Sequence, residues 1–329
     1  MNDLKTILKK YDLKPNKLLG QNFLIDRTVL EKIIGAADLS KKDTVLEVGP
    51  GLGILTEELA KHAGGVIAVE KDKGLASFLQ KRFGRVKNID ILQGDAMKFN
   101  SPQPPLKLRG GEGELYHYKL VANIPYYLTS HLIRKFLEAE NPPAQIVLMV
   151  QKEVAQRICA KPPEMSLLAV SVQFYAEPKI ISFVSKKSFW PRPKVDSAII
   201  KITPRDTNTC HSCPESVIPA KAGIQFGVNS SRNPGISGSR IPEVNASHYN
   251  GAGKCGTTEE KKKFFTVVKA GFSHPRKQLI NNLSQGLKID RIKLVEILKK
   301  IGLAPQQRAE TLSVEDWIKL TKQLSAVMR

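Results

Sequence analysis

Five short apolar runs between residues 44 and 151 have the pattern of strands that are covered on both faces. Each run has six or seven residues, many of them β-branched, and lacks a clean alternation of polar and apolar positions. The runs are residues 44–49, 65–70, 89–95, 119–124 and 145–151. Between them apolar residues recur at helical spacing, as Leu52, Leu55 and Leu59 do. This alternation predicts an α/β fold with a parallel, doubly wound sheet, in which ligands bind beyond the carboxyl ends of the strands.

Two more apolar runs, residues 179–185 and 197–203, predict two further strands, with antiparallel pairing as one option. They complete a first domain that we place at residues 1–205. A second segment, residues 206–258, is dense in Gly, Pro, Ser and Asn and has no hydrophobic period, which predicts an exposed and largely disordered insertion. Residues 101–115 have a similar composition and predict a smaller insertion between two strands.

From residue 259 to residue 329 the pattern is helical only, which predicts a small all-helical C-terminal domain. Ile292, Val295 and Leu298 fall on one helical face, and Gly302 is placed to end that helix. The start of a later helix has the residues of a capping box and a hydrophobic staple: Ser313, Asp316, Leu312 and Trp317.

The charge of the chain indicates a polyanionic partner. Lys and Arg number 51 against 31 Asp and Glu, a formal net charge of +20, and the basic residues are spread along the chain. The alternative is a highly charged surface without such a partner. No stretch reaches the ~20 apolar residues of a membrane span, the first residues lack the apolar core of a signal peptide, and four cysteines do not form a disulfide framework. We therefore expect a cytoplasmic protein that does not bind membranes.

The first predicted strand runs into a glycine-rich turn. Glu47 is followed by Gly49, Gly51 and Gly53, and a helical pattern begins directly afterwards. Glycines at such a turn permit positive φ and the close approach of a ligand to the backbone. The spacing is G-x-G-x-G and not the G-x-G-x-x-G of dinucleotide sites. It suits a nucleoside with a charged amino-acid tail better than a pyrophosphate, although glycine-rich turns after strands are common.

Acidic residues end the next two predicted strands. Glu70 can accept hydrogen bonds from both hydroxyls of a ribose, or it can simply be a solvated acid at a strand end. Asp95 lies where it could accept from the amino group of an adenine, with Ala96 and Met97 beside the ring. The sequence has no phosphate-binding lysine motif. S-adenosylmethionine therefore fits this set better than NAD or ATP.

The fourth predicted strand ends in an amide, a proline and two aromatic residues, from Asn123 to Tyr127. The exocyclic amine of a nucleobase is a poor nucleophile and must be held with its lone pair toward a methyl donor. The side-chain oxygen of Asn123 and the backbone carbonyl of Ile124 could accept its two N–H groups, with Pro125 fixing the backbone. Tyr126 could stack on the base, and Tyr127 is expected to pack in the core. The alternative is a structural turn with a satisfied asparagine.

A base within a duplex cannot reach such a pocket, so the target must be flipped out or unpaired. A second aromatic ring on the far side of the base would then complete a sandwich. Phe189 is our candidate, and Trp190 is its competitor. Both residues could instead be ordinary core aromatics in a loop.

Several of these segments resemble the small-subunit ribosomal RNA adenine dimethyltransferases, which are related to the Erm resistance methyltransferases. The similar segments are "LGQNFLID" (19–26), "LEVGPGLGILTEEL", "VIAVEKD", "QGDAM", "VANIPYYLTS", "FWPRPKVDSAI" and "FFTVVKAGFSHPRKQLINNL" (264–283). They cover nearly everything outside the two predicted insertions, which are departures from the family pattern. The segment around residues 206–258 is much shorter in the family, and here it looks like a translated repetitive element.

This resemblance implies a Rossmann-like methyltransferase domain, an rRNA-binding helical domain and S-adenosylmethionine as methyl donor. The implied reaction adds two methyl groups to N6 of each of two adjacent adenines near the 3′ end of small-subunit rRNA. The implied partner is a nearly assembled small ribosomal subunit, and we expect the protein to act as a monomer. The resemblance assigns cofactor contacts to Asn22, Leu24, Gly49, Glu70, Asp95 and Asn123, with Asn123 spanning cofactor and substrate. The glycine turn adds Gly51 to the cofactor-binding residues that we expect.

Other functions remain open from the sequence. An Erm-like enzyme would act on large-subunit RNA, and a ribosome-assembly factor would bind subunits with only incidental catalysis. A nicotinamide oxidoreductase is less favoured, because nothing supplies a hydride-acceptor site. Ligand-like spacing for zinc occurs at Cys210, His211, Cys213 and Cys255, but no strand or knuckle pattern surrounds them, and we expect no metal.

Overall fold

The computed structural model describes residues 21–98, 118–205 and 258–328 of the chain. The chain divides into two units, of which the first comprises Met1–Arg205 together with Lys263–Arg329. The second unit, Asp206–Lys262, is described only at the start of one helix. Both predicted insertions and the four residues with zinc-like spacing lie outside the described residues. Whether residues 259–329 form an independent domain stays a prediction.

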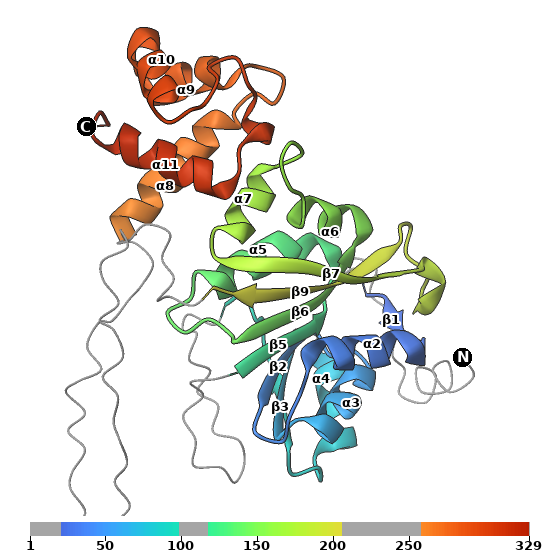
Figure 1. Cartoon of the computed structure of the whole chain (residues 1–329). Coiled ribbons are helices and arrows are strands. Elements are labelled where there is room, and N and C mark those ends of the chain that lie inside the picture. Colours follow the sequence, from blue (N-terminus) through green and yellow to red (C-terminus); the bar gives the residue numbers. More distant parts are fainter. Residues whose placement is uncertain (1–20, 99–117, 206–257, 329) are drawn as a thin grey trace, which may run out of the picture. The chain divides into compact units, whose positions relative to one another are not determined.

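A seven-stranded sheet organises the first unit, in the order β4-β3-β2-β5-β6-β9-β7 (Figure 1). The strands are β2 (Thr44–Val48), β3 (Gly65–Glu70), β4 (Ile89–Gln93), β5 (Tyr118–Asn123), β6 (Gln145–Gln151), β7 (Ala176–Val184) and β9 (Ser197–Pro204). The first five are parallel, as predicted, and β9 pairs antiparallel with both β6 and β7. Because β2 pairs with both β3 and β5, the strand order reverses there, which opens a crevice at the carboxyl ends.

Helices cover both faces of the sheet and form two separate cores with it. On one face lie α2 (Arg27–Ala37), α3 (Ile54–His62) and α4 (Lys73–Phe83). On the other lie α5 (Thr129–Leu137) and α6 (Lys152–Ile158). Both faces of the central strands are therefore buried, which explains their apolar runs without alternation. None of the helices in the described ranges is both long and apolar enough to cross a membrane.

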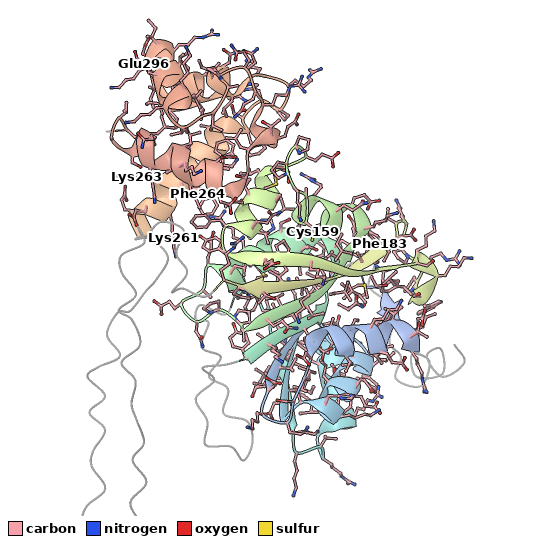
Figure 2. All side chains as sticks on the ribbon, in the orientation of Figure 1. Cys159, Phe183, Lys261, Lys263, Phe264 and Glu296 are labelled. Carbon is pink, nitrogen blue, oxygen red and sulfur yellow. The ribbon has the colours of Figure 1, made fainter. Side chains whose placement is uncertain are left out.

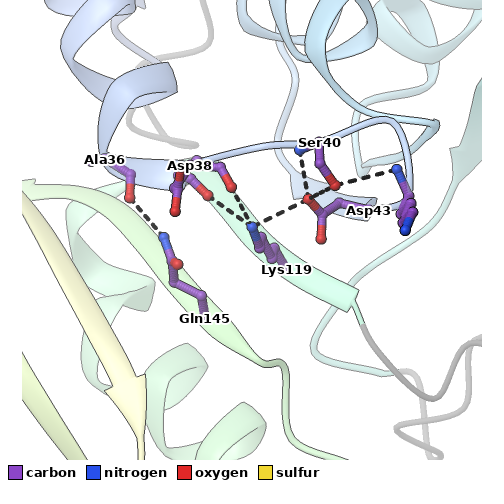
Figure 3. Close-up of polar contacts among 8 residues, drawn as sticks. Ala36, Asp38, Ser40, Asp43, Lys119 and Gln145 are labelled. Carbon is purple, nitrogen blue, oxygen red and sulfur yellow. Dashed lines mark hydrogen bonds and ion pairs between the residues drawn. The ribbon is translucent and has the colours of Figure 1, made fainter.

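The carboxyl end of α2 is fixed to the sheet by polar side chains (Figure 3). The ammonium of Lys119 on β5 donates to the Asp38 carbonyl at 2.5 Å and pairs with Asp43 at 3.3 Å. The amide of Gln145 on β6 donates to the Ala36 carbonyl at 2.7 Å. A cation at this position satisfies orphan carbonyls and complements the helix dipole. These contacts anchor α2, and so the segment that leads into it.

A short ribbon that the sequence did not predict precedes α2. It consists of β1 (Phe23–Leu24) paired antiparallel with β8 (Phe189–Trp190). The hydroxyl of Ser188 also donates to Asp26, the N-cap of α2, at 2.8 Å. Strands of two residues have no hydrophobic period, so only the folded chain reveals this pairing. It holds residues 22–24 at the carboxyl edge of the sheet.

The C-terminal segment contains four helices around a third core. They are α8 (Thr258–Gly271), α9 (Leu279–Leu287), α10 (Arg291–Lys300) and α11 (Val314–Ser325). Residues 165–170, at and before helix α7 (Leu167–Gln173), share this core. Phe264 of α8, labelled in Figure 2, stacks on Phe174 with ring centroids 4.2 Å apart. The helical character of this segment is confirmed.

Local predictions for this segment had mixed outcomes. The capping box of Ser313 and Asp316 is confirmed, with reciprocal bonds of 3.1 and 3.0 Å. Gly302 has a φ of +76° directly after α10, as its predicted helix-ending role requires. The prediction for Ile292 was wrong: its side chain is 72% exposed, whereas Leu294 and Leu298 are buried. Two positions along a helix are a turn of about 200°, so the face that contains Leu294 cannot also contain Ile292.

Candidate active site

The main candidate site is a cleft at the carboxyl ends of β2, β3, β4 and β5, where the strand order reverses. Four strand ends contribute to it, together with the segment around β1. The sequence-predicted residues that line it are Asn22, Leu24, Gly49, Gly51, Glu70, Asp95, Asn123, Ile124, Pro125 and Tyr126. Residues as far apart in the chain as Asn22 and Tyr126 therefore converge on one cavity.

The glycine turn after β2 has the backbone conformation expected from its sequence. Gly49, Gly51 and Gly53 have φ values of +70°, +60° and +76°, a region that side chains other than glycine rarely adopt. A Cβ atom on Gly53 would lie 2.5 Å from the ring of Phe83. Glycine is thus required in this turn both by the backbone conformation and by the lack of space for a side chain. Without side chains, the backbone of the turn is open to close approach by a ligand.

Glu70 is buried at the end of β3 and holds this turn. One carboxylate oxygen accepts from the Gly51 N–H at 3.1 Å, and the other accepts from the Asp72 N–H at 2.9 Å. Burial raises the pKa of Glu70, and these two hydrogen bonds oppose the rise. A carboxylate oxygen has more than one lone pair, so each can accept a further hydrogen bond from a ligand hydroxyl in the cleft.

Asp95 lies after β4, at the rim of the same cleft. One of its oxygens accepts from the Met97 N–H at 2.9 Å, and the other pairs with Lys71 at 3.0 Å. Burial would raise the pKa of Asp95, but these contacts outweigh it and hold the pKa below its ordinary value. The carboxylate is therefore charged and oriented, with Ala96 and Met97 beside it in the cleft wall. Lys71 also lines the cleft, although nothing in the sequence had singled it out.

The end of β5 presents an oriented amide to the cleft. The Asn123 nitrogen donates to the backbone carbonyl of Asn22 at 3.3 Å. This bond uses the amide nitrogen and leaves the side-chain oxygen as the available acceptor. After Asn123 the chain passes through Ile124 and Pro125 into a 3₁₀ turn, η2 (Tyr126–Leu128), closed by the Leu128 N–H donating to the Pro125 carbonyl at 3.0 Å.

The two tyrosines of this turn have different surroundings. Tyr126 is partly buried, and its hydroxyl forms a 2.8 Å hydrogen bond with the Ser197 hydroxyl. Burial raises the pKa of Tyr126. The prediction that Tyr127 packs in the core was wrong, because its side chain is 55% exposed at the rim of the cleft. Successive residues of a 3₁₀ turn point about 120° apart, so both rings cannot face inward.

Phe189 and Trp190 do not line the cleft, although they pair with Leu24 and Phe23, which do. Phe189 is only 3% exposed, belongs to the core that α2 shares with the sheet, and does not line the cavity. Trp190 packs against the same core. The structure thus does not bring either predicted second stacking ring to Tyr126, and the stacking role stays a prediction.

A second buried carboxyl, that of Glu47, lines the cleft. From the sequence, Glu47 was noted only as the acid before the glycine turn. Glu47 on β2 is 1% exposed, and burial raises its pKa to about 8, with the Glu70 carboxylate adding to the rise. The nearby Thr56 hydroxyl opposes this rise in the pKa of Glu47, although it does not form a hydrogen bond with good geometry. Oε2 of Glu47 has no hydrogen-bond partner in the described part of the chain. Such a group suits a cationic ligand that would supply the missing contact.

Comparison with known proteins agrees with this geometry. A family model described as ribosomal RNA adenine dimethylase matches residues 12–214. A protein from Dehalococcoides mccartyi, named ribosomal RNA small subunit methyltransferase A, is 42% identical over 320 residues, which is 97% of this chain and 92% of that protein. A protein of the same name from Moorella thermoacetica is 34% identical over 321 residues, covering 97% and 95%.

Two solved structures share the fold. The 23S rRNA methyltransferase ErmE has a TM-score of 0.63 at 23% identity, covering 92% of this chain and all of the other. A dimethyladenosine transferase from Plasmodium falciparum has a TM-score of 0.67 at 23% identity, covering 92% and 98%. These likenesses confirm the predicted methyltransferase fold with a helical C-terminal segment. The family model and the curated relatives show that the chain belongs to the ribosomal RNA adenine dimethylase family.

Proposed function

We propose that this chain transfers methyl groups from S-adenosylmethionine to N6 of two adjacent adenosines near the 3′ end of small-subunit rRNA. The observation that carries this proposal is the convergence of Gly51, Glu70, Asp95 and Asn123 on one cleft. The names of the curated relatives support the small subunit over the Erm-like alternative.

The cleft residues fit S-adenosylmethionine by their chemistry. When bound, this cofactor supplies an electrophilic methyl group on a positively charged sulfur. Glu70 would accept from its ribose hydroxyls, Asp95 from its adenine amine, and the glycine turn would approach it closely. The carboxyl of Glu47, whose Oε2 has no hydrogen-bond partner among the described residues, would face its ammonium group, which accounts for an otherwise costly buried acid. Asn22 and Leu24, held by the β1–β8 ribbon, would complete the wall.

The target adenine would be held by the end of β5. The Asn123 side-chain oxygen and the Ile124 carbonyl would each accept one N–H of the exocyclic amine, which directs its lone pair at the methyl group. Tyr126 would stack on the flipped base, and its bond to Ser197 limits the motion of the ring. Positioning and electrostatics supply the catalysis, with no strong general base required.

The C-terminal helical segment would bind the ribosomal subunit. Between residues 258 and 328 the chain has 14 Lys and Arg against 7 Asp and Glu. Such an excess favours phosphate contacts and gives binding a steep salt dependence. We further propose that the enzyme is cytoplasmic and acts as a monomer. Light scattering of the purified protein should then give the mass of a single chain.

The test is methyl transfer from labelled S-adenosylmethionine to unmethylated small subunits, followed by mapping of the modified adenosines. Asn123→Ala should abolish transfer and leave the melting temperature nearly unchanged, because within the described ranges the amide makes one long hydrogen bond, of 3.3 Å. Lys42→Gln, an exposed position on the loop after α2 that does not line the cleft, provides a control. Label appearing in large subunits instead would favour the Erm-like alternative.

The basic helical segment also favours a role in subunit assembly that does not need catalysis. The discriminating measurement is whether Asn123→Ala still binds immature small subunits and supports their maturation. Assembly that proceeds normally with this variant would separate the two roles, and assembly that fails would tie maturation to methyl transfer.

A further inference from the structure

We propose that a lysine-lined groove at the outer edge of the sheet, remote from the cleft, binds phosphate groups of the RNA backbone. This inference rests on the proposed function, which makes RNA the substrate. The groove lies between α2 and strands β7 and β9. The residues that concern its chemistry are Lys32, Lys179, Lys201, Ser182, Thr203 and Glu177, and we call the first three the groove lysines.

The fold brings these lysines together from three elements. Lys179 on β7 is the direct antiparallel partner of Lys201 on β9, so both side chains lie on the same face of the sheet with Cβ atoms about 5 Å apart. Lys32 extends from α2 over the same face, where its ammonium donates to the Ser182 hydroxyl at 3.2 Å. Ile199, two residues before Lys201, is buried in the core of this face. The sheet therefore changes from core to a basic surface at this point.

The groove lysines form no ion pair with a carboxylate of the described residues. Like charges directly opposite each other in a sheet destabilise it. Across the described ranges, none of the three lies within 4.0 Å of a carboxylate. Glu177 is the single acid among the groove residues, and it is paired in register with Thr203.

A lysine elsewhere on the same sheet shows the contrast. Lys119 on β5 is neutralised by Asp43 and by the carbonyls at the end of α2 (Figure 3). The fold thus provides hydrogen-bond and ion-pair partners for Lys119, a lysine with a structural role. Three clustered lysines that lack an acidic partner within the described ranges indicate instead that the neutralising group comes from a ligand, and that it is an anion.

The chemistry of the groove favours phosphate groups over bases. Ammonium groups and the Thr203 hydroxyl are donors that match phosphate oxygens, whereas the Ser182 hydroxyl already donates to the Phe183 carbonyl at 3.1 Å. The groove has no aromatic ring on which a base could stack among the described residues that line it. Its contacts would add affinity and orientation without reading sequence.

The groove is well separated from the cleft along the sheet. Lys201 lies opposite Val147, in the amino-terminal half of β6, whereas Asn123 lies opposite Met149 toward its carboxyl end. Strands β6 and β9 also lie between β5 and β7 (Figure 1). An RNA that reaches both places must extend beyond the target adenosines.

The test compares two triple variants with the same loss of charge. The groove variant carries Lys32→Gln, Lys179→Gln and Lys201→Gln. The control variant carries Lys81→Gln, Arg85→Gln and Lys87→Gln, three exposed positions on and after α4, at the opposite edge of the sheet. Binding to unmethylated small subunits and to poly(U) is measured from about 0.05 to 0.5 M salt, the range over which phosphate contacts weaken. S-adenosylmethionine affinity and melting temperature are measured alongside.

The expected loss follows from counterion release. With a salt slope of about −0.7 for each single-strand phosphate contact, one contact accounts for about fivefold in affinity at about 0.1 M salt. The groove variant should therefore bind RNA about 100-fold more weakly, with a salt slope smaller by about 2. Its cofactor affinity should be unchanged, and its melting temperature without RNA should rise because the repulsion is removed. The single variant Lys201→Gln should show about a fivefold loss, which keeps the test valid if the triple variant folds poorly.

Two results would overturn the proposal. Equal losses in the groove and control variants would mean that only net charge matters. Unchanged RNA binding with a selective loss of binding to polyglutamate would mean that the groove takes an acidic protein. The proposed function fails separately, if wild-type protein transfers no methyl group to small subunits while the groove variant still loses RNA affinity.

Discussion

Replacing Glu47 with glutamine tests the buried carboxyl in the wall of the cleft. In the folded chain burial raises its pKa from 4.5 to about 8, whereas in the unfolded chain it returns to its ordinary value. The folded state therefore binds more protons than the unfolded state between these two pH values. Wild-type stability consequently falls as pH rises across this window. At about 1.4 kcal/mol per pH unit, the loss between about pH 4.5 and pH 7 is about 3 kcal/mol.

The assay is urea unfolding of wild type and Glu47→Gln at about pH 5.5, 7 and 8.5, which spans the upper part of this window. Glutamine has nearly the same shape and does not titrate, so the variant should lose most of this pH dependence. Its absolute stability includes the cost of a buried amide, which is the same at each pH. The informative quantity is thus the change with pH in the difference between the two proteins. Glu70 also has a raised pKa and should leave a smaller slope in the same direction in the variant.

Cofactor binding gives a second measurement of the same carboxyl. A cationic ammonium beside Glu47 would lower its pKa, so wild-type protein should release a proton when it binds S-adenosylmethionine at about pH 7. Calorimetry in two buffers of different ionisation enthalpy measures that proton, and Glu47→Gln should release much less. Parallel stability curves for wild type and variant, together with equal proton release, would refute the reasoning.

Two further predictions concern aromatic residues. Tyr126→Phe should lower the free energy of unfolding by about 1 kcal/mol through loss of the bond to Ser197, yet keep methyl transfer within a few-fold. Tyr126→Ala should lower transfer by about 10–100-fold, because stacking on a base contributes roughly 1–3 kcal/mol; equal turnover of both variants would exclude a stacking role. Phe189→Leu should lower stability by about 1 kcal/mol and keep turnover, because the ring is buried in the core and does not line the cleft. A folded Phe189→Leu protein without turnover would instead restore Phe189 as the second stacking ring.

The strands could be predicted from the sequence, as could the glycine turn, Glu70 and Asp95 at the ends of the first three, because the sequence patterns that indicate them are local. A strand buried on both faces needs an apolar run, and a turn at positive φ needs glycine, so β2 and Gly51 are visible in the sequence itself. Acids that follow such strands converge by topology, since parallel strands place their carboxyl ends at one edge. For this reason Glu70 and Asp95 were found without any knowledge of contacts.

The predictions that failed concern which way a side chain points in a short or non-periodic element. The turn η2 has no repeat from which the orientation of Tyr127 could be deduced. Ile292 is apolar at a plausible spacing, but which face of α10 is buried depends on the neighbouring helices and not on α10 alone. Phe189 lies in a two-residue strand whose partner strand is far earlier in the chain, at Phe23–Leu24, and its burial is set by that pairing.

Asn22 shows how a contact between distant residues completes the site. The sequence offered no physical reason to select it, and only the family resemblance assigned it to the cofactor. In the structure its backbone carbonyl accepts from the Asn123 amide, 101 positions away, and so fixes which end of that amide faces the cleft. The β1–β8 ribbon and the Asp26 cap hold the carbonyl in place. The acceptor geometry that we propose for Asn123 is therefore set by the segment before α2, and a displacement of that segment should impair target positioning even if Asn123 itself is intact.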